Sequence, residues 1–301
     1  MESRVPFLNP AAVLSPLGGV RLLQCVCCCV ALSLVAHDGG WDGAPGYFCM
    51  SAWCFCLALS SLVVCFEFTR LHGCLRLSWE NFTITFALLA AQMVLTATVV
   101  FPVYFASDLQ CQGCPSRGDY FRISATVCSA VACLAYGVEV HLTRARPGSL
   151  GGYMATAPGL LKVVQAYVSC IIFGALLHDS EYGRYPATQW CVGVYSVCFI
   201  LTVAVIGLNV AGKVPVPHCP MDRVVVLYTF LAALLYLSAS IVWPIFCFDH
   251  KYGSVERPAS CSRGHCSWDS QLVIAIFTYV NLILYAADLI YSQKVLYIAR
   301  P

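Results

Sequence analysis

The sequence predicts an all-α, polytopic membrane protein with eight transmembrane helices, arranged as two tandem four-helix bundles. Its composition, eight long apolar stretches and an internal repeat predict this fold. Of the 301 residues, 59% are hydrophobic and 11% are charged, whereas a soluble domain carries about 25% charged residues. The excess of apolar side chains needs lipid as its solvent. The net charge of +2 gives no reason to expect a nucleic-acid partner.

Eight stretches of the chain are long and apolar enough to cross a bilayer, which requires about 20 mostly apolar residues. The first apolar run, 22–36, has the length of a signal-peptide core. We expect it to be retained, because no small-x-small cleavage signal follows it. No joint between the stretches is long enough to fold into a soluble domain. The expected spans are 17–36, 46–66, 82–105, 121–141, 157–177, 188–210, 223–247 and 270–291.

The second half of the chain repeats the first at an offset of about 141 residues, so that 95–102 aligns with 237–244. Because each half has an even number of spans, the two halves point the same way across the membrane. We expect a segment 1–16, a first module 17–154, a second module 155–298 and an end 299–301. The aligned residue pairs include Arg21 and Lys162, Gln24 and Gln165, Pro45 and Pro186, Tyr136 and Tyr285, and Glu139 and Asp288.

The distribution of Lys and Arg predicts the orientation. Of the 17 basic residues, 11 lie on the side that holds both termini and 6 lie on the other side. Basic residues in short loops stay cytosolic, so we expect both termini in the cytosol, in the plasma membrane or secretory-pathway membranes. The sequon Asn81-Phe82-Thr83 then lies at the cytosolic end of the third span, and a sugar on Asn81 would reverse this orientation.

Four charged residues within the spans occupy matching places in the two halves. Arg21 and Lys162 lie about one turn inside the cytosolic end of the first helix of each module, and Glu139 and Asp288 lie at a similar depth on the last. A charge in the membrane usually has a partner or extends to the headgroups. We expect Arg21 to pair with Glu139 and Lys162 with Asp288. The alternative is that all four extend separately to the headgroups.

Two prolines, Pro102 and Pro244, fall near the outer ends of the third and seventh spans. A proline removes a backbone donor and bends or ends a helix. We interpret both as helix ends or kinks, and a hinge is the functional alternative.

The stretch Gly152-Tyr153-Met154-Ala155-Thr156-Ala157-Pro158-Gly159-Leu160-Leu161-Lys162, together with the repeat, resembles the myeloid-associated differentiation marker family. The resemblance covers about residues 17–298. It implies two MARVEL domains, each a four-span module with cytosolic ends. MARVEL proteins are implicated in membrane apposition, raft-like lipid domains and the organisation of vesicles or junctions. The family offers no motif of catalytic residues to carry over, and we expect neither an enzyme nor a cofactor.

Cysteines in the expected outer loops form two close pairs. Cys111 and Cys114 lie in one loop, and Cys261 and Cys266 lie in the equivalent loop of the second half. Because the outer side is oxidising, we expect one local disulfide in each loop. The alternative is a zinc site formed by His250, Cys261, His265 and Cys266, although the spacing of these residues is irregular for zinc.

A further cysteine, Cys74, lies between Arg70 and Arg76 on the expected cytosolic side. A juxtamembrane cysteine beside basic residues is a candidate for palmitoylation, and an unmodified thiol is the alternative. Cys65 and Cys219 are weaker candidates.

Three functional classes compete. The first is a protein that organises lipid domains, including cholesterol-rich ones, or acts as a scaffold for vesicle, junction or cortex-linked assemblies. Membrane lipids and other membrane proteins, in homo- or hetero-oligomers, are its expected partners.

The second class is a transporter or channel for ions or small solutes. We explain the deeper polar residues Gln92 and Asn281 by hydrogen bonds between helices. The third, an intramembrane enzyme, lacks an HExxH or GxSxG motif. We favour the first class.

Overall fold

The computed structural model describes residues 8–39, 41–105, 117–144, 152–178, 180–212, 221–259, 261 and 266–298. Eight of the helices in these ranges are long and apolar enough to cross a membrane, which confirms the prediction of an all-α fold with eight spans. The helices are α1 (Pro10–Leu14), α2 (Pro16–Asp38), α3 (Ala44–Phe68), η1 (Leu71–Cys74), α4 (Trp79–Phe105), α5 (Arg117–Thr143), η3 (Tyr153–Ala155), α6 (Ala157–Leu177), η4 (Tyr182–Arg184), α7 (Pro186–Val210), α8 (Met221–Phe248) and α9 (Ser267–Ile298).

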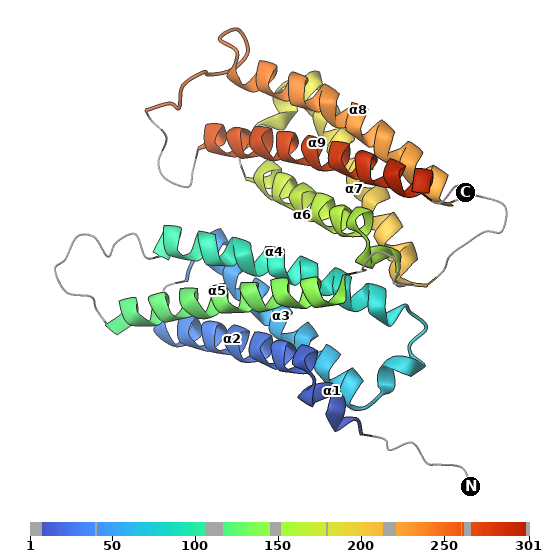
Figure 1. Ribbon diagram of the computed structural model, residues 1–301. Helices are drawn as coiled ribbons and strands as arrows, with labels where there is room; N and C mark the ends of the chain where they lie inside the picture. The colour runs from blue at the N-terminus through green and yellow to red at the C-terminus, as the bar shows by residue number, and fades with distance from the viewer. Residues whose placement is uncertain are drawn as a thin grey trace. The chain divides into compact units, whose positions relative to one another are not determined.

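The chain divides into two compact units, Met1–Ala155 and Thr156–Pro301. In the first unit, α2 packs against α3 and α5, and α4 packs against the same two helices. The second unit repeats this arrangement, because α6 packs against α7 and α9, and α8 packs against the same two (Figure 1). Each unit is therefore a closed four-helix bundle in which the first helix lies beside the last.

The first helices of the two units begin with the same local chemistry. Ser15 Oγ accepts a hydrogen bond from the Gly18 amide at 3.0 Å, and Thr156 Oγ1 accepts one from the Gly159 amide at 3.4 Å. A Ser or Thr at this position satisfies an amide that the helix leaves without a partner. A proline in the first turn follows each cap, where its missing donor costs nothing. The repeat thus extends to the helix starts.

Proline lies inside a helix at equivalent places in the two units. Pro102 is inside α4, which continues to Phe105, and Pro244 is inside α8, which continues to Phe248. Both prolines therefore lie in the last turns of their helices, near the outer ends of the spans as the sequence predicted. At the end of α4, Arg122 Nη1 donates to Phe105 O at 2.7 Å.

Aromatic rings fill the interior of both bundles at matching positions. In the first unit, the fully buried Trp53 donates from Nε1 to Ser129 Oγ at 2.9 Å. In the second unit, the fully buried Tyr195 lies at the equivalent place, with its hydroxyl 2.7 Å from Thr278 Oγ1. A buried polar tip needs such a partner, and in each unit the last helix supplies a hydroxyl for it.

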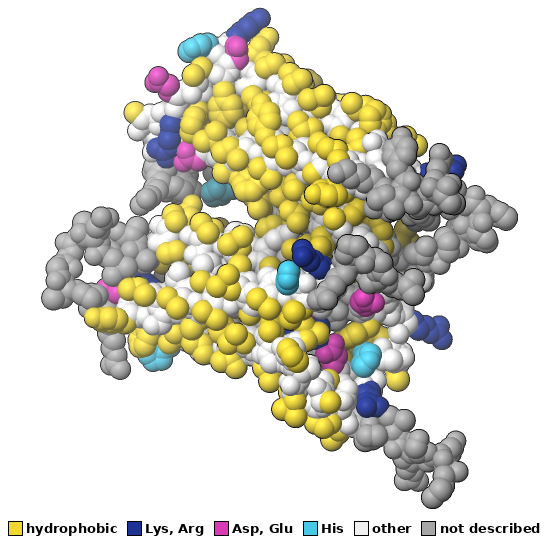
Figure 2. All heavy atoms as spheres, in the orientation of Figure 1, with side chains coloured by type: hydrophobic (Ala, Val, Ile, Leu, Met, Phe, Trp, Pro, Cys, Tyr) yellow, Lys and Arg dark blue, Asp and Glu magenta, His cyan; other side chains and the backbone are white. Residues whose placement is uncertain are grey.

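The outward faces of the helices are apolar. Only 28% to 44% of each hydrophobic window is buried inside the structure, yet the exposed remainder stays hydrophobic, as Leu134 (70% exposed), Ile200 (63%) and Ile283 (67%) illustrate. Figure 2 shows hydrophobic side chains covering the visible flanks of the helices. Water would not solvate surfaces of this extent on a monomer, so these helices are solvated by lipid.

Candidate functional site

A buried cluster of charges joins α2 to α5 near one end of the first unit. Arg21 Nε lies 2.6 Å from Glu139 Oε1, and the second oxygen of Glu139 accepts from Gln24 Nε2 at 2.8 Å. The side chains of Arg21 and Glu139 are only 3% and 4% exposed. Arg21 and Gln24 lie one turn apart on α2, so one helix face presents both donors to the same carboxylate.

The second unit contains the same arrangement between α6 and α9. Lys162 Nζ lies 2.7 Å from Asp288 Oδ2, and both side chains are fully buried. Gln165 Nε2 donates to the same oxygen at 3.0 Å, and Ser292 donates to Oδ1 at 3.2 Å. The structure therefore brings together both pairs of charges that the repeat singled out, rather than leaving them apart at the headgroups.

Sequence reasoning missed several partners of these two bases. In the first unit, Arg21 Nη1 also contacts Glu67 on α3, and Trp79 Nε1 donates to Glu67 at 3.0 Å. In the second unit, Lys162 donates to Thr229 Oγ1 at 2.8 Å and lies 4.8 Å from the ring centroid of Tyr228. The acidic residue Glu67 at the end of an apolar stretch was the one feature of the sequence that could have indicated a further partner for Arg21.

The deeper polar residues differ in how they are satisfied. Asn281 Nδ2 donates to Tyr236 OH at 2.8 Å and to Ser169 Oγ at 3.1 Å, which are hydrogen bonds between helices. The carbonyl oxygens of both side chains, Asn281 Oδ1 and Gln92 Oε1, are buried and find no hydrogen-bond partner among the described residues. Hydrogen bonds between helices therefore account for Asn281 through its nitrogen, but they do not account for Gln92 Oε1. In the second unit, the backbone places Leu234 at the equivalent position of α8.

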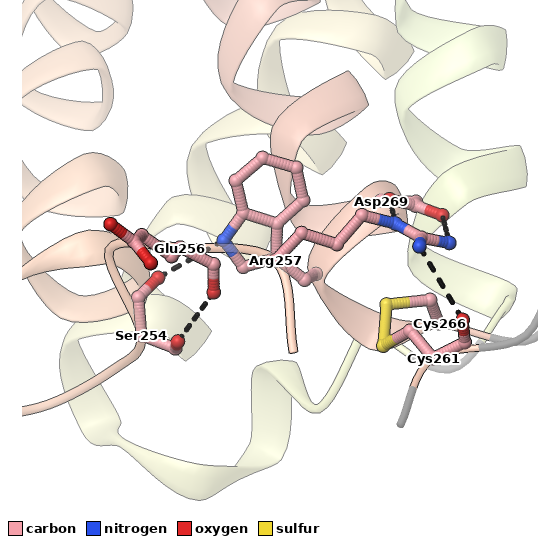
Figure 3. Close-up of a disulfide and its surroundings, with 7 residues drawn as sticks. Ser254, Glu256, Arg257, Cys261, Cys266 and Asp269 are labelled. Carbon is pink, nitrogen blue, oxygen red and sulfur yellow. Dashed lines mark hydrogen bonds and ion pairs between the residues drawn. A yellow bond between two sulfur atoms is a disulfide. The ribbon is translucent and has the colours of Figure 1, made fainter. Parts of the chain in front are cut away.

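A disulfide joins the loop after α8 to the start of α9. The sulfurs of Cys261 and Cys266 are bonded at 2.12 Å, so two of the four ligands considered for zinc are bonded to each other. Figure 3 shows the disulfide beside Arg257, whose guanidinium bridges to Asp269 at 2.8 Å. This hydrogen-bonded carboxylate raises the pKa of Arg257 above its usual value. Cys111, Cys114 and His265 lie outside the described residues.

The cysteine considered for acylation ends the short helix η1. Cys74 is exposed, as are the neighbouring side chains of Leu71 and Leu75. Cys65 is also exposed, on the last turn of α3, whereas Cys219 lies outside the described residues. Residues 71–75 therefore present a thiol and two leucines on the surface between Arg70 and Arg76, a composition suited to the membrane interface.

The sequon asparagine is buried rather than displayed. Asn81 is 7% exposed, and its Oδ1 accepts from the Met154 amide at 3.3 Å. Gly152 passes so close that a Cβ atom there would lie 2.0 Å from the same oxygen. The side chain of Asn81 thus anchors the segment that contains η3 to α4, and in the folded unit it does not face solvent as a glycosylated residue would.

Taken together, the buried polar groups hold helices to one another. Each base has an acid partner, and each acid also accepts a hydrogen bond from an amide on the first helix of its unit. Such pairs leave the outward surface free for lipid. The arrangement defines a class of protein: a multi-pass membrane protein built from two four-helix modules, each closed by a buried ion pair.

Comparison with known proteins agrees with this class. The model of the MARVEL family, described as a membrane-associating domain, matches residues 12–142 and 153–291. Myeloid-associated differentiation marker-like protein 2 of Homo sapiens is 60% identical, over 97% of this chain and 95% of its own. The Xenopus laevis protein of that name is 52% identical over 98% and 97%. Myeloid-associated differentiation marker of Homo sapiens is 42% identical over 96% and 91%.

The chain belongs to the MARVEL family, with two MARVEL domains, and is similar over nearly its whole length to the myeloid-associated differentiation marker proteins. The family resemblance expected from the sequence is thereby confirmed. No solved structure matches the chain.

Proposed function

We propose that this protein organises the membrane around it, as a centre for lipid domains or as a scaffold for vesicle, junction or cortex-linked assemblies. One observation carries the proposal: polar side chains pair inside each bundle, while the outward faces of all eight spans are apolar. A surface of that kind interacts with lipid and with other membrane helices. The proposal includes neither a catalytic reaction nor a cofactor.

Phase-separating giant vesicles test the proposal directly. The fluorescently labelled chain, reconstituted at increasing density, should enrich in one lipid phase and slow the diffusion of a lipid probe there. A single-span helix at the same density is the control. Equal partitioning between phases, with lipid diffusion like that of the control, would contradict an organising role.

The orientation is part of the proposal, with both termini in the cytosol of plasma-membrane or secretory-pathway membranes. The excess of Lys and Arg on that side supports it. Epitope tags at each end should stain only after the plasma membrane is permeabilised. Staining of either tag in intact cells would reverse or break the proposed topology.

Acylation of Cys74 is a further element of the proposal, supported by its exposure beside basic residues. Acyl-exchange labelling of the wild-type chain should exceed that of Cys74→Ser by one site. Equal labelling of the two would leave Cys74 as a free thiol.

Transport is the second candidate, because the core of the second unit holds a chain of polar groups from Asp288 through Gln165 to Asn281. Hydrogen bonds between helices account for these contacts. Flux of ions or small solutes into liposomes that contain the chain, above that of empty liposomes, would favour transport over organisation.

A further inference from the structure

A groove runs between α4 and α5 on the outward face of the first unit. Its volume is about 530 Å³. Small side chains form its floor, among them Ala91, Cys133 and Gly137, and Leu134 and Val138 stand at its sides. Nothing lies within 4 Å of the position that a Cβ atom would take on Gly137. The space above the floor is therefore open to a molecule from the membrane.

The groove has one apolar end and one basic end. His141 lines it near the end of α5, about 12 Å along the helix axis from Cys133. Arg144 directly follows the end of α5, three residues after His141, and both side chains are exposed. An apolar channel of this length that ends in two basic groups complements an acyl chain that carries a negative headgroup.

The repeat supplies an internal comparison. The equivalent positions on α8 and α9 hold Leu282 in place of Cys133, Ile290 in place of His141, and Gln293 in place of Arg144. The floor is thus bulkier in the second unit, and neither of these two positions carries a basic group, although Lys294 follows Gln293 in the sequence. The combination of open floor and basic end belongs to the first unit.

We propose that this groove binds an anionic phospholipid, with an acyl chain over Gly137 and the net negative headgroup at His141 and Arg144. This proposal adds a lipid class to the proposed organising function. It rests on the proposed orientation, which puts the basic end of the groove in the cytosolic leaflet, where anionic lipids concentrate. The site would let the protein select a lipid class rather than accept every neighbour equally.

Photo-crosslinking of the full chain in liposomes tests the site. Phosphatidylserine and phosphatidylcholine with the same diazirine-bearing acyl chain are each added as tracers, and crosslinked peptides are mapped by mass spectrometry. Phosphatidylserine should label residues 88–95 and 133–141 about fivefold more than phosphatidylcholine does, the factor expected for one base near an anionic headgroup. Residues 230–237 and 282–290, the internal control, should show no preference.

Two variants separate the headgroup from the chain. Arg144→Gln, which copies the second unit, should abolish the preference for phosphatidylserine while total labelling persists. Gly137→Leu should reduce labelling by both lipids, because its side chain fills open space rather than displacing a neighbour. Equal labelling of the wild-type groove by the two lipids, or unchanged labelling of Gly137→Leu, would overturn the proposal.

Gln92 distinguishes lipid from a second copy of the chain. An acyl chain needs no hydrogen bond, so Gln92→Leu should leave the labelling unchanged. A helix of another copy would use the Gln92 amide and bring the two Cys133 thiols within reach of a bismaleimide crosslinker. A crosslinked dimer through Cys133 that Gln92→Leu abolishes would overturn the lipid assignment. Because the liposomes hold tracer in both leaflets, this experiment is independent of the orientation that the epitope tags test.

Discussion

Arg21 and Lys162 occupy equivalent places but solve the burial of a base differently. Arg21 divides its guanidinium between Glu139 and Glu67, which suits a planar group with several fixed donors. Lys162 concentrates its charge on Asp288 and adds a hydroxyl and an aromatic ring. The difference in chemistry follows the surroundings, because the side chain of Glu67 is 21% exposed whereas every charge in the second unit's pair is fully buried.

Breaking the pair in the second unit should be costly. Lys162→Met leaves the Asp288 carboxylate buried without its counter-charge, a change that destabilises proteins by about 3–5 kcal/mol. The expected result is a clear fall in the midpoint of thermal unfolding in detergent micelles.

The double variant Lys162→Met/Asp288→Leu is the matched control. Removing both charges leaves apolar side chains in an apolar core, so most of the lost stability should return. A single variant that melts like the wild type would show that the pair contributes little.

The segment that contains η3 depends on one close approach. Gly152→Ala places a methyl group against Asn81 Oδ1 and should displace the acceptor of the Met154 amide, at a cost of about 1–3 kcal/mol in the free energy of unfolding. The midpoint of thermal unfolding in detergent micelles measures this loss of stability. Gly73→Ala, where a Cβ meets nothing within 4 Å, is the control and should melt like the wild type.

Replacing Asn81 in the Gly152→Ala background tests whether the clash with Asn81 causes the loss of stability. Gly152→Ala/Asn81→Ala removes the clash, so the second substitution should cost less there than in the wild type. If the losses of unfolding free energy from the two single substitutions add up to that of the double variant, Gly152 and Asn81 act independently.

The loop before α9 gives a prediction about redox state. Cys261 and Cys266 should resist a maleimide of high mass until the protein is reduced, and reduction should then add two labels relative to Cys261→Ser/Cys266→Ser. The unfolding free energy of that variant should fall by at most about 2 kcal/mol, because the loop that the bridge closes is short. Two labels gained without reduction would show free thiols.

The eight membrane-spanning helices were largely predictable from the sequence, because the length of each apolar stretch indicates where a helix crosses the bilayer. The expected span 17–36 became Pro16–Asp38, within two residues at each end, whereas 270–291 became Ser267–Ile298, which continues seven residues further. The helices α1 and η1 were not predicted, since neither has an apolar period long enough to register. The end of α4 at Phe105 coincides with the end of the expected span 82–105, beyond Pro102.

The candidate site was predictable only where the repeat marked it. Matching positions identified Arg21 with Glu139 and Lys162 with Asp288. The second half has no acid at the position equivalent to Glu67, and no hydroxyl in the first half matches Thr229, so the repeat could not reveal those contacts. The groove could not be predicted, because it depends on which faces of α4 and α5 point outward side by side. A single sequence does not contain that packing information.

At the scale of the whole molecule, each unit has its own core and its own ion pair. Residues 1–155 and 156–301, expressed as separate chains, should each resist carbonate extraction from membranes and unfold cooperatively on heating. A chain ending at residue 105 keeps α2, α3 and α4 but lacks α5; it is the control, which should aggregate or be degraded. Loss of either complete half when expressed alone would show that the units depend on each other.

The position of each ion pair has a consequence during synthesis. Lys162 on α6 enters the bilayer three helices before Asp288 on α9, the acid that neutralises it, whereas Arg21 on α2 can already pair with Glu67 of the next helix, α3. Until α9 arrives, the nascent second unit holds an unmatched cation in hydrocarbon, a state costly enough to keep it near the insertion machinery or to expose it to degradation. The second unit therefore needs its fourth helix to neutralise its buried base, while the first unit starts to do so with its second membrane-spanning helix.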